Sequence, residues 1–485
     1  MAAAVKIDVF GGMQPRLDAT ALGDTQATVA KNCRLHTTKL NPIMAPLDVS
    51  DMPIRLENGL MDVRDAKTIR IWTRGNGVRD VIAWPGIVQI APSNINDDDR
   101  FRLFVTGETG VTDENGENQP CVLVSSRNAK TYDRHPLYKD IPPPVEMRYW
   151  TDSDPVVPSV ELDAATIRHT YFFQTFVDEY GYESGQSNVA TDLDGNMVEF
   201  DYNNNQKVTW LGISHSTAQY TIPDWVVARR LYMSVAGDEK DTVRFVCEQK
   251  ITAGVNGAFE QKQRININDE DVAEEAPNIT STPADLVWMT QMPGNFYVGF
   301  LRSNPRCVCF SDVGLPTSFP DAYRYTIRDF AIGIAVAGNT AFVLTKGYPW
   351  ALSGTAPEGM TAAQIVSEQA CVSARSICTF EGKVYYASQD GICVLAEDSL
   401  NSTVITRAYW DKASWSALNP KSCIMAAYDN ALFCWFTLAD GARKMYVIDF
   451  DVGGNPIITE HDDYASCVFV DVEKDQLFFV REEEV

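Results

Sequence analysis

The side chains that most often carry chemistry in proteins are few and scattered in this chain. The 485 residues include five histidines and eleven cysteines, and no two histidines stand at the spacing of a metal-ligand pair. Cys307 and Cys309 flank a single residue, so in a strand both thiols point to the same face, but two thiols make only half of a zinc site. The sequence therefore predicts no catalytic residue, no metal ligand and no cofactor.

The motifs of common enzyme classes are also missing from the sequence. There is no glycine-rich phosphate loop followed by Lys-Ser or Lys-Thr, no G-x-S-x-G and no H-E-x-x-H. Ser388–Gly391 is similar to the Asp-box turn of sialidase propellers, but it is one residue short, and a plain Asp-Gly hairpin turn explains it. The sequence leaves open whether two carboxylates form a catalytic pair for glycoside hydrolysis, because it gives no distances between the 65 acidic residues. We expect a protein that is not an enzyme.

The charge balance is strongly acidic. Lys and Arg total 41 and Asp and Glu total 65, which gives a formal net charge of −24 and a pI near 4.6. Affinity for DNA comes largely from Lys and Arg that displace counterions, so the chain as a whole is not expected to hold a phosphate backbone. Short acidic runs, which we interpret as solvated loops or tails rather than metal sites, occur at 97–99, 269–271, 462–463 and 482–484.

The cysteines predict a reducing compartment. Their number is odd, no C-x-x-C pair occurs, and most lie inside apolar runs such as Phe433-Cys434-Trp435. Buried free thiols explain this pattern better than a disulfide framework. The first residues, MAAAVKIDVFGG, lack a segment like the core of a signal peptide, and no run of 18 apolar residues occurs. We expect a protein made in the cytosol that does not span a membrane.

A repeat of hairpins organises the last 200 residues. Short apolar, aromatic-rich runs follow turn-like pairs, and the intervals between the pairs are 44, 44, 47 and 45 residues. Strand, tight turn, strand and a longer connection, with a period near 45, is typical of the four-stranded blade of a β-propeller. An irregular β-sandwich with evenly spaced strands is the alternative. The turn-like pairs are Gly294-Asn295, Gly338-Asn339, Gly382-Lys383, Asp429-Asn430 and Lys474-Asp475.

The repeat is interrupted in the middle of the chain. Residues 1–145 read as an N-terminal arm and the first blade or blades, and prolines 142–144 indicate a linker. Residues 146–280 contain about seven short predicted strands, which favours an inserted fibronectin-like β-sandwich. Residues 281–485 supply the remaining blades. The predicted fold is all-β, a six-bladed propeller with one inserted sandwich. We expect it to close where a strand at 467–470 or 476–480 shares a blade with N-terminal residues.

Several stretches resemble the nozzle protein, also called tail tubular protein B, of podovirus-type bacteriophages. The first is 10–42, FGGMQPRLDATALGDTQATVAKNCRLHTTKLNP, and the second is 310–325, FSDVGLPTSFPDAYRY. Further similar stretches are GYPW at 347–350 with SG at 353–354, QACVS at 369–373, YGYES at 180–184 and RRLY at 229–232.

This resemblance implies a structural virion protein made in the host cytoplasm. It implies six copies in a ring around the axis of a short tail, with DNA passing through a central channel during ejection. It also implies contacts to an adaptor ring on the portal side and to tail fibres or a tip protein. The candidate channel residues are the acids of two runs, Asp97, Asp98 and Asp99 together with Asp269, Glu270 and Asp271.

An acidic wall suits a conduit, because it repels the duplex and suppresses contacts that would retain it. A function of another class stays open, namely a glycan-binding or glycan-cleaving propeller. That alternative predicts a monomer with aromatic residues and paired carboxylates on the propeller axis.

Overall fold

The structure is a computed structural model, and it describes most of the chain outside the middle third. The described residues are 9–35, 39–49, 54–56, 63–73, 79–94, 102–113, 115–124, 133–136, 148–150, 167–169, 172–178, 183–187, 189, 199–201, 207–211, 226–234, 243–250, 262–266, 282–397, 401–450 and 454–481.

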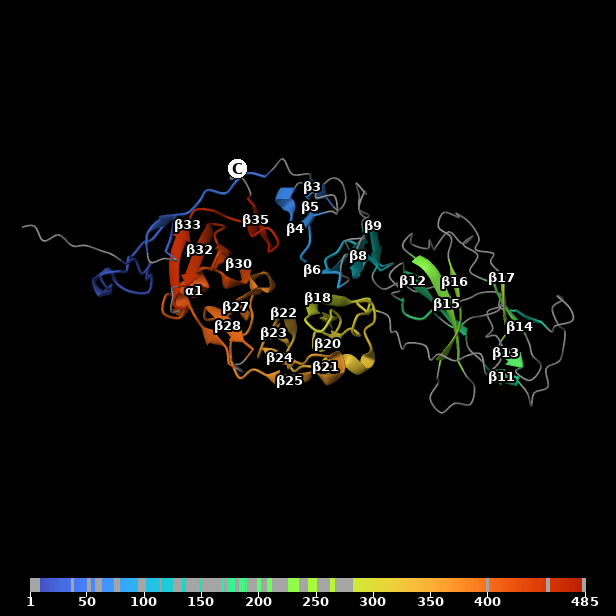
Figure 1. The fold of residues 1–485 in the computed structure, drawn as a ribbon. Helices are drawn as coiled ribbons and strands as arrows, with labels where there is room; N and C mark the ends of the chain where they lie inside the picture. Colours follow the sequence, from blue (N-terminus) through green and yellow to red (C-terminus); the bar gives the residue numbers. More distant parts are fainter. Residues whose placement is uncertain are drawn as a thin grey trace, which may run out of the picture. The chain divides into compact units, whose positions relative to one another are not determined.

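The chain is all-β and divides into two compact units (Figure 1). Unit 1 comprises 1–134, 285–314 and 321–485, and unit 2 comprises 135–284 and 315–320. The boundaries expected from the sequence lie at 145/146 and 280/281.

Sheets of four antiparallel strands dominate unit 1, and in each the strands follow chain order. They are β6 (Val88–Pro92), β7 (Leu103–Gly107), β8 (Cys121–Val124) and β9 (Asp133–Pro136); β18 (Leu286–Met292), β19 (Phe296–Leu301), β20 (Cys307–Phe310) and β21 (Arg324–Thr326); β22 (Ala331–Ala337), β23 (Thr340–Thr345), β24 (Trp350–Ser353) and β25 (Thr361–Gln364); β26 (Cys378–Phe380), β27 (Lys383–Ala387), β28 (Ile392–Ala396) and β29 (Thr403–Val404); and β30 (Ile424–Tyr428), β31 (Ala431–Thr437), β32 (Arg443–Phe450) and β33 (Pro456–His461).

Smaller elements complete unit 1. Three further sheets are β1 (Cys33–Arg34) with β2 (Asn41–Pro42); β3 (Ile54–Leu56), β5 (Arg79–Trp84) and β4 (Thr68–Thr73) in that order; and β34 (Cys467–Asp471) with β35 (Gln476–Val480). The helices are short: η1 (Ala19–Ala21), η2 (Val63–Asp65), η4 (Asp321–Tyr323), η5 (Pro357–Gly359), η6 (Ala374–Ser376), α1 (Lys412–Ala417) and η7 (Pro420–Ser422).

The five predicted turns are confirmed as hairpin turns. Each joins the first and second strands of successive sheets, namely β18–β19, β22–β23, β26–β27, β30–β31 and β34–β35. Glu381 and Gly382, and likewise Asp429 and Asn430, all have positive φ. A two-residue turn of this kind has a twist that matches the right-handed twist of its strands.

The sheets from β22 to β35 bury apolar side chains on both faces, because successive side chains of a strand alternate between the faces. The sheet β22–β25 shows the pattern. Ile334, Ala341, Val343 and Leu352 belong to the cluster shared with β18–β21, whereas Ala335, Phe342, Leu344 and Ala351 belong to the cluster shared with β26–β29.

Apolar clusters join neighbouring sheets along unit 1. They join β3–β5–β4 to β6–β9, β18–β21 to β22–β25, β22–β25 to β26–β29, β26–β29 to β30–β33, β30–β33 to β34–β35, and β34–β35 to β3–β5–β4. Between β6–β9 and β18–β21, the rings of Phe104 and Tyr297 meet edge to face at 5.6 Å, and the Tyr297 hydroxyl donates to the Pro92 carbonyl at 2.8 Å.

The C-terminal strands contact the N-terminal part of the chain, but not in the way that the sequence predicts. Among the described residues, β34 and β35 pair with each other and with no N-terminal strand. They pack face to face on the N-terminal sheet, where Cys467 and Val480 join Ile69, Ile71 and Val81 in one cluster. The prediction of a shared blade is therefore wrong. Both faces of β34–β35 are apolar, so each face needs a separate neighbouring sheet.

Unit 2 contains small antiparallel sheets. They are β10 (Arg148–Trp150), β14 (Lys207–Leu211) and β17 (Lys262–Asn266); β11 (Ile167–His169) and β13 (Glu199–Asp201); and β12 (Phe172–Asp178), β15 (Val226–Ser234) and β16 (Val243–Lys250).

Gly382, in the hairpin turn of β26–β27, allows a test of the energetic cost of a positive φ. Gly382 has a φ of +69°, and a methyl group there would meet nothing within 4 Å. Gly382→Ala should therefore lower the free energy of unfolding by about 1 kcal/mol, through the left-handed backbone alone. Gly359 has the same open surroundings without a positive φ, so Gly359→Ala should change stability by less than about 0.5 kcal/mol. Equal effects of the two changes in denaturant unfolding would contradict this account.

Candidate functional site

The N-terminal segment that carries the longest resemblance is docked on the edge strand β33. Backbone hydrogen bonds run from the Met13 N–H to the Ile458 carbonyl at 3.0 Å and from the Asn32 N–H to the Glu460 carbonyl at 2.9 Å. Gly12 has a φ of +75°, and a Cβ there would lie 2.9 Å from the Ile458 carbonyl oxygen. Gly12 of this stretch is thus explained by its positive φ and by the close approach of two backbones.

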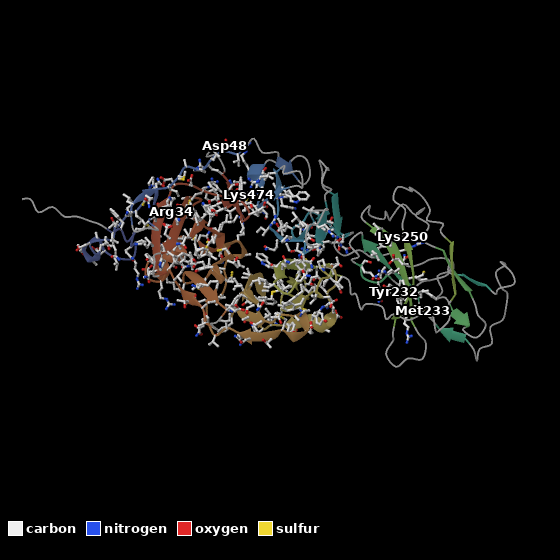
Figure 2. The ribbon with its side chains drawn as sticks, in the orientation of Figure 1. Arg34, Asp48, Tyr232, Met233, Lys250 and Lys474 are labelled. Carbon is white, nitrogen blue, oxygen red and sulfur yellow. The ribbon has the colours of Figure 1, made fainter. Side chains whose placement is uncertain are left out.

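Arg34 is the anchor of this segment, and it lies against the sheet β30–β33 (Figure 2). Its guanidinium donates to the Asp449 carboxylate at 2.8 Å, to the Asp429 carboxylate at 3.0 Å and to the Asp429 carbonyl at 2.9 Å. The Leu35 N–H donates to the second oxygen of Asp449 at 3.1 Å. Arg34 also lies over the ring of Phe433, 5.6 Å from its centre. Because Asp449 is fully buried, this charge pair depends on the N-terminal segment being in place.

A buried histidine lies beside the same anchor. The His461 ring hydrogen-bonds the Thr459 hydroxyl at 2.9 Å, and its Nδ1 has no hydrogen-bond partner. Burial lowers the pKa of His461 to about 4, so the ring is neutral at pH 7. A neutral ring adds no charge to the Arg34–Asp449 pair.

Other stretches of unit 1 that carry the resemblance also form hydrogen bonds that hold its strands and turns. The side chain of buried Gln369 accepts a hydrogen bond from the Ser388 hydroxyl at 2.8 Å and donates one to the Asp390 carboxylate at 3.0 Å. Its main-chain carbonyl accepts a hydrogen bond from the Tyr386 hydroxyl at 2.8 Å. The turn that is similar to an Asp box is therefore held by a glutamine. Ser311, in the stretch 310–325, accepts from the Tyr297 N–H at 2.9 Å.

Two resembling stretches meet in unit 2. Glu183 of the YGYES stretch is almost fully buried and accepts from Arg230 at 2.7 Å, from Thr175 at 2.5 Å and from the Tyr232 hydroxyl. Burial and the hydrogen bond to Glu183 raise the pKa of Tyr232. Arg230 also pairs with the half-exposed Glu248 at 2.9 Å. This network ties the bend at 183–187 to the sheet β12–β15–β16.

Acidic and basic side chains are distributed unequally between the connections at the two ends of the sheets from β18 to β35. In a meander of four strands, the first and third connections lie at one end, and the second connection and the links between sheets lie at the other. Among the described residues, the first and third connections of these sheets hold eight acidic residues and one basic residue, Lys474. We call these acids the acidic end; they are Asp312, Asp321, Glu358, Glu381, Glu397, Asp429, Glu473 and Asp475.

The opposite connections carry a mixed charge. Their described residues include eight basic and seven acidic side chains. The basic ones are Arg302, Arg306, Arg328, Lys346, Arg375, Arg407, Lys412 and Lys421. Among the described residues, the connections at one end of these sheets are therefore acidic, whereas those at the other end are nearly neutral.

The channel residues expected from the sequence lie outside the described part of the chain. This holds for Asp97, Asp98, Asp99, Asp269, Glu270 and Asp271. Sequence reasoning missed the acidic end, although its signal was present in the hairpin turns, where Glu381, Asp429 and Asp475 stand beside or within the predicted turn pairs.

The thiol pair occurs as predicted from its spacing. The sulfur atoms of Cys307 and Cys309 are 3.9 Å apart on one face of β20, and the hydrogen bond with Cys309 lowers the pKa of Cys307 to about 7. All eleven cysteines are free, in agreement with the sequence. Within the described residues, no group of three or more His, Cys, Asp or Glu side chains is placed to hold a metal ion. No described helix is both long and apolar enough to cross a membrane.

Comparison with known proteins finds no matching family model and no matching curated protein. Among solved structures, the N-terminal domain of Nup159 is 10% identical, with a TM-score of 0.27, over 53% of this chain and 59% of that chain. The extracellular domain of a one-component system from B. thetaiotaomicron is 8% identical, with a TM-score of 0.28, over 78% of this chain and 49% of that one. The matches thus span only about half to three fifths of these two chains, and likenesses this distant carry no functional argument.

Removal of the Arg34 charge should release the N-terminal segment. Arg34→Met leaves Asp449 buried without its partner, which should cost about 3 kcal/mol of stability. Hydrogen–deuterium exchange should become faster at residues 30–35 and along β33. Arg16 donates to the Arg407 carbonyl at an exposed position, so Arg16→Met serves as the control and should leave that exchange unchanged. Unchanged protection in Arg34→Met would show that the segment is held by its backbone contacts alone.

Proposed function

We propose that unit 1 is a closed β-propeller of seven blades and that the chain is a structural subunit of a phage tail nozzle. The order of the apolar clusters, together with the contact of Phe104 with Tyr297 between β6–β9 and β18–β21, supports closure, because passing from each sheet to the next leads back to β3–β5–β4. Seven blades replace the expected six, because the N-terminal region supplies two sheets, β3–β5–β4 and β6–β9. The fibronectin-like arrangement of unit 2 remains part of the same proposal.

The observation that carries the nozzle proposal is the acidic end. In a closed propeller, successive blades have the same orientation, so the first and third connections of all blades surround one mouth of the axis. In the proposed ring, this end of each propeller faces the central channel, where acidic side chains repel DNA and offer few cations to its phosphates. The resemblance of the N-terminal segment to nozzle proteins supports the same assignment.

The residues of the resembling stretches support a structural role rather than a catalytic one. Arg34, Gln369 and Glu183 each satisfy buried polar groups of neighbouring elements. None of these contacts leaves a reactive group open to a substrate. In a virion, the assembled ring would contact an adaptor on its portal side and fibres or a tip protein elsewhere, and DNA would pass without specific binding.

Assembly state is the first test of this proposal. Purified protein at micromolar concentration should form rings of six copies with a central opening, seen by electron microscopy and with a matching mass by light scattering. A monomer that cleaves or retains a polysaccharide would instead favour the glycan-directed alternative. Turnover lost on replacing one carboxylate would establish that alternative.

The acidic end should also govern passage of DNA. Neutralising four of its acids should slow ejection from virions at low salt, because the channel then repels the duplex less and permits contacts that retain it. Added salt should reduce the difference. A control variant neutralises four acids outside this end, and its ejection rate should match that of the unmodified virion. Equal rates in both variants would remove electrostatics from the proposal. The test set is Glu358→Gln, Glu381→Gln, Glu473→Gln and Asp475→Asn, and the control set is Asp24→Asn, Glu117→Gln, Glu368→Gln and Asp440→Asn.

A further inference from the structure

The short segment 373–377, which leads into β26, is hydrogen-bonded to more than one sheet of unit 1. The Ser376 hydroxyl accepts from the Ala387 N–H at 2.9 Å, within the sheet β26–β29 to which the segment leads. The Ser373 hydroxyl donates at 2.7 Å to the carbonyl of Cys423, the residue that precedes β30. Both serines are buried. The segment therefore ties the sheet β26–β29 to the next sheet, β30–β33.

Arg375, in the middle of this segment, reaches two further sheets. Its Nη2 donates to the Lys67 carbonyl at 3.1 Å and to the Ser466 carbonyl. Lys67 directly precedes β4, and Ser466 directly precedes β34. Burial lowers the pKa of Arg375, so the two carbonyls replace water that the guanidinium has lost. A single nitrogen atom thus joins the start of β4 to the start of β34.

The sheets that Arg375 joins are not neighbours of its own sheet. Apolar clusters place β30–β33 between β26–β29 and β34–β35, and β3–β5–β4 lies one sheet further on. The strands β22, β26, β30, β34 and β4 contact one another in succession, so in a closed ring they surround the axis. A side chain that joins sheets which are not neighbours has to cross that axis. Because 373–377 is a link between sheets, the crossing lies at the end opposite the acidic end.

Side chains of sheets that are not neighbours also meet at Gly333, in β22. A Cβ at Gly333 would lie 2.5 Å from Ile377 Cδ1 and 2.7 Å from Trp288 Cζ2. Ile377 precedes β26 and Trp288 belongs to β18, and the sheet β22–β25 lies between their two sheets. Trp288 has a φ of +60° at a bulge of β18, and its indole N–H donates to the Ile334 carbonyl at 2.7 Å. A glycine at 333 leaves room for both side chains, which fill the space beside the axis.

The contact between β34–β35 and β3–β5–β4, which we call the seam, joins distant parts of the chain. Among the described residues, no strand is shared across it. It is held by an apolar cluster and by Arg79, which pairs with Asp471 at 2.6 Å and donates to Gln476 at 3.0 Å. Arg79 and Asp471 are 392 positions apart, whereas consecutive sheets from β18 to β35 are also joined by short links of the chain. The seam is therefore where a ring of these sheets opens most readily.

We propose that Arg375 is a latch that holds the seam closed from across the axis. Its two acceptors belong to opposite sides of the seam, Lys67 to one and Ser466 to the other, so the seam cannot open while both bonds are made. Hydrogen bonds from a charged donor are the stronger ones, and these two replace the shared strand that the seam lacks. The inference rests on the proposed closure of unit 1 and does not require the nozzle role.

Hydrogen–deuterium exchange of the full chain tests the latch. Arg375→Met should make exchange about tenfold or more faster in β4 and β34, and should leave β23 and β24 unchanged, because only the seam loses its bonds. Arg302 provides a matched control. It donates to the carbonyls of Asn118 at 2.8 Å and Gly107 at 3.0 Å, so it joins two neighbouring sheets without crossing the axis. Arg302→Met should leave exchange in β4 and β34 unchanged.

A conservative variant separates the latch from general stability. Arg375→Lys keeps a charged donor with a shorter reach, so β4 and β34 should lose less protection than in Arg375→Met. Unchanged exchange at the seam in Arg375→Met, or exchange that rises equally in all sheets, would overturn the latch. If Arg375→Met does not fold, Arg375→Lys and Arg302→Lys are compared instead, and equal exchange at the seam in these two would overturn it.

The outcomes also separate the latch from the proposed function. Fast exchange of β4 and β34 in the unmodified protein would contradict closure of the propeller, and the latch with it. Seam protection that depends on Arg375, in a protein that forms no rings, would support the latch and contradict the nozzle. Rings whose seam protection does not depend on Arg375 would leave the nozzle standing and overturn the latch.

Discussion

The architecture of unit 1 depends on one constraint: each of its small sheets is apolar on both faces. A strand that buries alternate residues on two sides cannot be satisfied by one neighbour. The sheet β22–β25 divides its side chains between two clusters, and β34–β35 does the same with only two strands. Every sheet therefore requires two partners, and a row of such sheets has no satisfied end unless its last member meets its first.

Much of this arrangement could be predicted from the sequence, because its signals are local. Turn pairs such as Gly338-Asn339 and Asp429-Asn430 mark hairpins by residue type alone, and the positive φ angles of Asp429 and Asn430 show why those residues stand there. The period near 45 residues predicts one sheet for each turn. The free state of the cysteines likewise follows from their number and surroundings.

The remainder could not be predicted, because it depends on contacts between residues distant in the chain. Arg34 and Asp449 are separated by 415 positions, and nothing near Arg34 indicates that its partner is a buried aspartate. Face-to-face packing of β34–β35 on the N-terminal sheet, in place of a shared blade, follows from which face of each strand is apolar and which sheets are adjacent. The acidic end is invisible until the connections are sorted by the end of the sheet at which they lie.

The docking of the N-terminal segment on β33 also has a consequence for biosynthesis. The ribosome makes Arg34 415 residues before Asp449, so the earlier segment cannot reach its partner until the intervening residues have emerged. Contacts of such high sequence separation fold slowly. Until then the nascent chain exposes an unpaired edge and apolar sheet faces, which are the features that promote aggregation. Docking of the N-terminal segment is thus coupled to the synthesis of the sheet β30–β33.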